Sequence, residues 1–178
     1  MDVAAQPLST PAKMGIITGI LYCVFVFIEN RFFYNSPIMF GALKGLFYII
    51  IISAIFYTGF LSKKESGGLI TFRDCLKAML LAIAITELFY LVFNILYLKF
   101  IDPAFIEKLK LSYLAFLKQQ KLPQEKIEEQ MQQFDGAGQI TTWGTIQSYG
   151  FSIIIDAVFA VIFAAILKKN KPFPENQS

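Results

Sequence analysis

The sequence has no histidine, only two cysteines, and few charged residues, which make up 16% of the chain. Without histidine it lacks the commonest metal ligand and the commonest general base at neutral pH. Cys23 and Cys75 have no C-x-x-C spacing and lie inside or beside apolar runs, so neither a zinc site nor a disulfide framework is indicated. We therefore expect no metal and no cofactor, and we interpret both cysteines as small buried apolar residues.

Catalytic and nucleotide-binding motifs are also missing from the sequence. It contains no Walker loop, no nucleophile elbow, no H-E-x-x-H pair and no paired-carboxylate glycosidase spacing. The net charge of +3 is small, and the basic residues stand beside apolar runs rather than in a patch that follows phosphates. We therefore expect a protein that is not an enzyme and does not bind nucleic acid.

Apolar residues, in contrast, are abundant. They make up 56% of the 178 residues, with 19 phenylalanines and a mean hydropathy of +0.56, which is too apolar for a soluble domain. Several runs reach the roughly 20 residues that a helix needs to cross a bilayer. The sequence therefore predicts an all-α integral membrane protein with four transmembrane helices and the lipid bilayer as its surroundings. The predicted spans are about 13–33, 38–61, 74–99 and 146–167.

The polar segments complete the predicted organisation. We expect a flexible N-terminus at 1–12, one four-helix membrane domain at 13–171 and a disordered tail at 172–178. Within the domain, a polar helical loop covers about 102–138, where Asp102 is a candidate N-cap and Pro103 suits the first helical position. Pro123 interrupts the apolar spacing of this loop, so we predict a helical hairpin between the third and fourth spans.

The distribution of basic residues predicts how the chain crosses the membrane. Four spans place both termini on one side, and most basic residues near span ends lie on that side, whereas the first loop offers only Arg31. The positive-inside rule then predicts cytoplasmic termini and an extracytoplasmic hairpin. The residues on the side of the termini are Lys13, Lys63, Lys64, Arg73, Lys168, Lys169 and Lys171.

Three ionisable residues fall at membrane depth, namely Lys44 in the second span, Glu87 in the third and Asp156 in the fourth. Charges there are costly and mark candidate functional sites. At about 1.5 Å per residue, Glu87 and Asp156 lie near the middle of the bilayer and Lys44 lies in its outer third. Lys44, with its long side chain, is therefore a candidate partner for either acid.

Polar residues continue from both acids at helical spacing and form two stripes. Together with Lys44, the stripes predict a small hydrated cavity that is open to the outside. The stripe on the third span is Glu87, Tyr90, Asn94 and Tyr97, and the stripe on the fourth is Tyr149, Ser152 and Asp156. The candidate intramembrane cluster is Lys44, Glu87, Tyr90, Asn94 and Asp156.

Two interpretations of this cluster stay open. In the first, Glu87 or Asp156 exchanges a proton or binds a cationic ligand. In the second, Lys44 and one acid form a buried ion pair, and tyrosine and asparagine hydrogen bonds hold the four helices in register. One lysine set against two acids leaves a carboxylate over, which keeps the first interpretation open.

The predicted hairpin carries apolar side chains on one face. This face either binds a protein partner or packs on the membrane interface or on itself. The candidate partner surface consists of Tyr113, Phe116, Met131 and Phe134.

Two small-residue pairs allow close helix approach, Gly15 with Gly19 and Gly41 with Gly45. Such pairs serve either packing within one chain or association with a second copy.

Several short stretches together resemble a known family. They are Thr71-Phe72-Arg73, the run Phe100-Ile101-Asp102-Pro103-Ala104-Phe105, the glutamate- and glutamine-rich loop after Pro123, Lys168-Lys169-Asn170-Lys171-Pro172, and Gly15 with Gly19. In these the chain resembles the bacterial membrane family catalogued as domain of unknown function 4199. The resemblance implies four transmembrane helices and a bacterial inner membrane, and it implies no activity and no catalytic residue.

Composition, motifs and resemblance together predict a structural or interaction protein, such as an accessory subunit, with a membrane protein partner or a second copy of itself. The alternative is a small transporter or a proton- or ligand-responsive channel that uses Glu87, Asp156 and Lys44.

Overall fold

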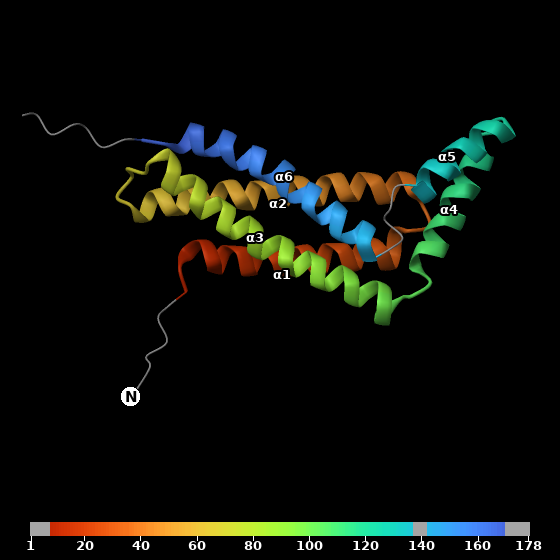
Figure 1. Ribbon diagram of the computed structural model, residues 1–178, viewed down its shortest axis with the longest axis horizontal. Helices are drawn as coiled ribbons and strands as arrows, with labels where there is room; N and C mark the ends of the chain where they lie inside the picture. Colours follow the sequence, from red (N-terminus) through yellow and green to blue (C-terminus); the bar gives the residue numbers. More distant parts are fainter. Residues whose placement is uncertain (1–7, 137–141, 170–178) are drawn as a thin grey trace, which may run out of the picture.

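The structure, a computed structural model, describes residues 8–136 and 142–169 (Figure 1). The expected tail at 172–178 and residues 1–7 of the expected flexible N-terminus lie outside these ranges. Within these ranges, all of the secondary-structure elements are helices. The elements are α1 (Thr10–Ile28), the π-helix η1 (Glu29–Phe33), α2 (Pro37–Glu65), α3 (Phe72–Leu96), the π-helix η2 (Tyr97–Ile101), α4 (Phe105–Gln119), α5 (Gln124–Gly136) and α6 (Thr142–Leu167).

Four helical segments are long and apolar enough to cross a membrane. They are Thr10–Phe33, Pro37–Glu65, Phe72–Ile101 and Tyr149–Leu167. Large apolar side chains on these helices face outwards, such as Ile49 and Ile166, which are 63% and 65% exposed. Such a surface suits lipid rather than water. The prediction of an all-α, four-span membrane protein is therefore confirmed.

The helix α3 packs against α1, α2 and α6 and is the centre of the bundle. The helix α1 packs tightly against α3, because Gly15 and Gly19 of α1 have no side chain to hold the two backbones apart. A Cβ at Gly19 would lie 2.8 Å from the Cβ of Phe89, and one at Gly15 would lie 2.9 Å from the carbonyl oxygen of Ala82. This glycine pair therefore serves packing within the chain.

An apolar core fills the half of the bundle that holds the start of α3 and the end of α6. It includes Ile51, Ile55, Cys75, Met79 and Ile83, all at most 1% exposed. Cys75 is buried, as expected. Cys23 is half-buried instead, and its thiol lies 3.6 Å from the carbonyl oxygen of Phe89, to which it donates.

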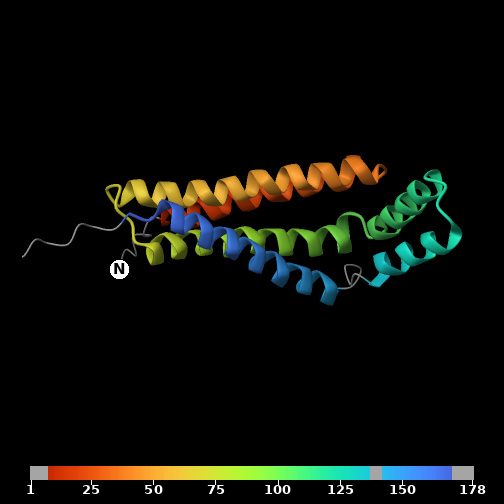
Figure 2. The ribbon, with the colours of Figure 1, turned by 90° about the horizontal axis from the view of Figure 1, so that it is seen from above.

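The two ends of the bundle differ. At one end, the backbone N–H of Lys169 donates to the carbonyl oxygen of Ile70 at 2.9 Å, which joins the end of α6 to the α2–α3 connection. At the other end lie the α1–α2 turn and the helices α4 and α5 (Figure 1). We call this the hairpin end. Figure 2 shows α6 diverging from α2 towards the hairpin end.

The first and third spans both end at the hairpin end in a π-helix, a feature often found at functional sites. Beyond η2, the start of α4 differs from the prediction. The helix begins at Phe105, and its N-cap residue Ala104 has no side-chain cap. Asp102 does not cap the helix, because its carboxylate accepts from the Lys108 ammonium at 2.9 Å.

Candidate functional site

Glu87 and Asp156 meet in the interior, brought together by the packing of α3 on α6. Each is 1% exposed, and their carboxyl groups lie close enough to interact directly. The Tyr48 hydroxyl, from α2, also donates to Asp156 Oδ1 at 2.8 Å. Two ionised carboxylates this close repel each other and cannot hydrogen-bond, so their proximity favours a state in which they share one proton. We call Glu87 and Asp156 the carboxyl pair.

Three tyrosines surround the carboxyl pair. Tyr22 of α1 stacks on Tyr90 of α3, with ring centroids 4.7 Å apart and planes 10° from parallel. Both rings and Tyr48 lie within electrostatic range of Glu87. Tyr90 also accepts a long hydrogen bond, 3.5 Å, from the side-chain amide of Asn94. A layer of hydroxyl groups from three helices thus adjoins the pair.

The same three tyrosines line a cavity of about 760 Å³ between the spans. We call it the outer cavity, because it lies on the hairpin side of the carboxyl pair. Its walls come from α1, α2, α3, α4 and α6, together with η1 and η2. Besides the tyrosines, its polar lining residues are Glu29, Asn30, Lys44, Asn94, Gln147 and Ser152.

Three site residues were not singled out in the sequence, namely Tyr22, Tyr48 and Glu29, and Glu29 is the charged one among them. Glu29 opens η1, is only 4% exposed and lines the outer cavity. Its Oε1 has no hydrogen-bond partner among residues 8–136 and 142–169. Glu29 stands beside Asn30 and Arg31 near the end of the first predicted span, and it was not counted among the ionisable residues at membrane depth. The sequence contains one signal of its role, because this acid lies inside the predicted first span at 13–33.

Lys44 is exposed and lines the outer cavity rather than pairing with Glu87 or Asp156. The buried ion pair of the second interpretation is therefore wrong. Tyr48, one helical turn along α2, takes the position beside Asp156, and the carboxylate on which the Lys44 charge acts is Glu29. The structure describes no ion pair between them, so a gap separates the two charged groups.

Other stripe residues divide between cavity and core. Tyr90, Asn94 and Ser152 line the outer cavity. Tyr97 does not, because it is fully buried in edge-on contact with Phe27 and Phe105. The π-helical backbone at η2 departs from the α-helical spacing on which the stripe was based.

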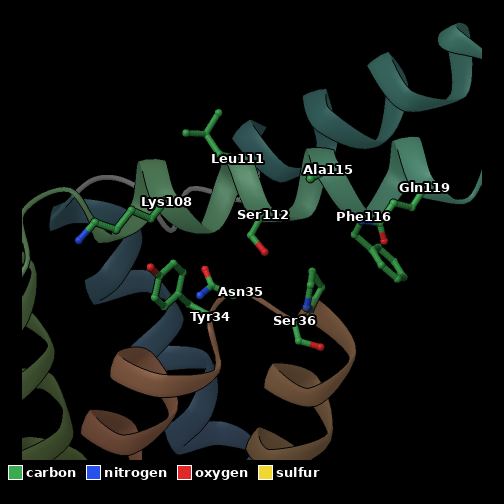
Figure 3. Close-up of a pocket in the computed structure, with 10 residues that line it drawn as sticks. Tyr34, Asn35, Ser36, Lys108, Leu111, Ser112, Ala115, Phe116 and Gln119 are labelled. Carbon is green, nitrogen blue, oxygen red and sulfur yellow. The ribbon is translucent and has the colours of Figure 1, made fainter.

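The candidate partner surface does not form one open patch among the residues whose side chains are described. The Tyr113 hydroxyl donates to Gln130 Oε1 at 3.3 Å, which joins α4 to α5. Phe116 lines a second cavity of about 480 Å³, between α4 and the α1–α2 turn (Figure 3). Met131 is half-buried. The side chain of Phe134 lies outside the described residues.

Four spans around a buried carboxyl pair and a polar-lined cavity define a multi-pass membrane protein. The sequence profile of a family described as "Protein of unknown function (DUF4199)" matches residues 13–169. The chain belongs to this family, which confirms the resemblance seen in the sequence. Comparison with curated proteins and with solved structures gives no match.

Proposed function

We propose that this protein is a small, non-enzymatic membrane transporter or ligand-responsive channel. In this proposal the outer cavity receives a ligand, and the proton held by the carboxyl pair is exchanged in response. The working residues are Glu87 and Asp156, with Tyr48 connecting them to the cavity and Lys44 at the cavity wall. Oligomerisation would complete a pathway that four helices alone barely enclose.

The observation that carries this proposal is the position of Tyr48. Its side chain lines the outer cavity and also donates a hydrogen bond to Asp156, which lies beside Glu87. A ligand that draws the Tyr48 hydroxyl towards itself removes one donor from Asp156. Ionisable residues inside membrane helices are expensive and mark proton relays and ligand sites. The Tyr48 hydroxyl thus links the cavity to the carboxyl pair.

The proposal includes an orientation and a location. We place the protein in a bacterial inner membrane with both termini in the cytoplasm. The lysines near the start of α1 and the end of α6 support this orientation. The outer cavity and the hairpin of α4 and α5 would then lie on the extracytoplasmic side.

Proton flux in vesicles tests the proposal. The full chain is reconstituted into liposomes that enclose a pH-sensitive dye, and a pH gradient is imposed. We expect flux above that of empty liposomes, and we expect Glu87→Gln and Asp156→Asn to abolish it. Glu107→Gln, which changes an exposed acid on α4, is the control and should keep it. Equal flux in the wild type and both core variants would count against the proposal.

A structural or interaction role is the second candidate, and one observation favours it. A Cβ added at Gly41 or Gly45 of α2 would meet no described atom within 4 Å, unlike at Gly15 and Gly19. Small residues that face open space suit the approach of another helix, from a second copy or a partner protein. The mass of the complex in mild detergent tests this role. We expect Gly45→Leu to dissociate such a complex, and a monomeric wild type would argue against it.

A further inference from the structure

The outer cavity opens sideways, between α2 and α6. Its exposed lining residues all come from these two helices, whereas those from α1, η1 and α3 are buried or half-buried. Figure 1 shows α6 crossing α2, and Figure 2 shows the two helices diverging towards the hairpin end. We call this opening the lateral mouth. The exposed residues at the mouth are Gly41, Lys44, Gly45, Gln147, Phe151 and Ile155.

The wall nearest the hairpin end is apolar. It consists of Phe105, Ile106 and Leu109, from the first turns of α4, and Phe105 is only 5% exposed. These side chains stand between the cavity and the aqueous side. A ligand therefore enters more readily from the bilayer, through the lateral mouth, than from water.

The cavity holds two opposite charges that do not pair with each other. Glu29 is buried, with Oε1 unpartnered among the described residues, whereas Lys44 is exposed at the mouth. A buried carboxyl group without a partner is costly to ionise, so a bound ammonium that donates to Glu29 would stabilise its ionised form. A ligand with an ammonium group for Glu29 and an anionic group for Lys44 satisfies both residues.

Glu29 lies close to the headgroup region of a membrane. Lys44 stands seven residues, or roughly 10 Å, into α2 from Pro37, and its long side chain can reach towards that region. Glu29 precedes the end of its span at Phe33 by four residues, roughly 6 Å at about 1.5 Å per residue. Phe151 and Ile155, on the side of the mouth away from the hairpin, offer an apolar surface for acyl chains. A bilayer lipid can therefore place its headgroup in the cavity while its chains stay outside.

We propose that the outer cavity binds the headgroup of a phospholipid with a primary amine, through the lateral mouth. The ammonium donates to Glu29, and the phosphate lies against Lys44. This inference rests on the proposed function, for which it names the ligand class.

Lipid selectivity tests the inference. The purified full chain in mild detergent is mixed with phosphatidylethanolamine, phosphatidylcholine or phosphatidylglycerol, and bound lipid is measured by native mass spectrometry. We expect the ethanolamine lipid to bind about tenfold more tightly than the choline lipid, because a quaternary ammonium cannot donate a hydrogen bond to Glu29. Soluble phosphoethanolamine at equal concentration should not displace the lipid.

The two charge variants should have different effects. Glu29→Gln should remove the preference for ethanolamine over choline, whereas Lys44→Gln should weaken both lipids alike, because both carry the phosphate. Lys99→Gln, which changes an exposed lysine outside the cavity, should alter neither. Gly45→Phe should block the mouth without disturbing the fold, because the added Cβ has open space. Circular dichroism confirms folding of each variant.

Three results with the wild type would overturn the inference. They are equal binding of ethanolamine and choline lipids by the wild type, a preference for the anionic glycerol lipid, and displacement by soluble phosphoethanolamine. Retained selectivity in Glu29→Gln would also overturn it. These lipid-binding results do not depend on the proton of the carboxyl pair. The flux assay therefore tests the proposed function independently of them.

Discussion

Replacing Asp156 tests how the carboxyl pair contributes to stability. Asp156→Leu removes the acceptor of Tyr48 and the partner of Glu87 together. A buried polar group left without a partner costs about 1–3 kcal/mol in soluble proteins. In membrane proteins a side-chain hydrogen bond averages about 0.6 kcal/mol and reaches about 1.7. Two lost bonds therefore cost roughly 1–3 kcal/mol of unfolding free energy.

Asp156→Asn should cost less than about 1 kcal/mol, because its amide accepts from Tyr48 and donates to Glu87.

The assay is reversible unfolding in mixed micelles of a mild detergent and sodium dodecyl sulfate, followed by circular dichroism. Glu107→Leu, the same kind of change at an exposed acid, is the control and should shift the unfolding free energy by at most about 0.5 kcal/mol. The reasoning is refuted if Asp156→Leu is as stable as the wild type, or if Asp156→Asn is as damaging as Asp156→Leu.

Three further stability predictions use the same unfolding assay. Gly19→Val should lower the unfolding free energy by about 1–3 kcal/mol, because the added side chain overpacks against α3. Gly45→Val, where the added side chain has open space, should lower it much less. Equal losses would contradict the tight packing of α1 on α3. Thr71→Ala should cost about 1 kcal/mol of unfolding free energy, because the Thr71 hydroxyl accepts from the backbone N–H of Asp74 in the first turn of α3 at 3.2 Å. An unchanged unfolding free energy would show that this N-cap does not stabilise the helix. Lys108→Gln should cost at most about 1 kcal/mol, because the partly exposed Asp102 pair is screened by water, so a larger loss would contradict this view.

Hydropathy was enough to predict the four spans, because no soluble fold accounts for apolar runs of that length. The cost of charges in a membrane singled out Glu87 and Asp156. That they lie beside each other did not follow from the sequence. Counting residues gives the depth of a side chain, but the rotation of each helix about its axis is set by packing.

The same limit explains the error at Lys44. Its depth left either acid within reach of a long side chain, but the α2 residue that faces Asp156 is Tyr48, one turn away. Lys44 lies at the cavity wall, within electrostatic range of Glu29.

The π-helices account for what was missed at the hairpin end. Patterns with a period of 3.6 residues assume α-helix, and η1 and η2 depart from it at Glu29 and Tyr97. Glu29 was not singled out and lies in the cavity wall, whereas Tyr97 was assigned to a polar stripe and lies in the core. A short π-helix leaves no recognisable sequence pattern.

Infrared spectroscopy of the purified protein in lipid at neutral pH tests the central claim, a proton held between Glu87 and Asp156. We predict a C=O stretching band of a protonated carboxylic acid. The difference spectrum against the wild type should show loss of this band in Glu87→Gln and in Asp156→Asn, where the remaining acid faces an amide, and no loss in Glu107→Gln. A wild-type spectrum without this band, or a difference spectrum that shows no loss in either core variant, would contradict the account.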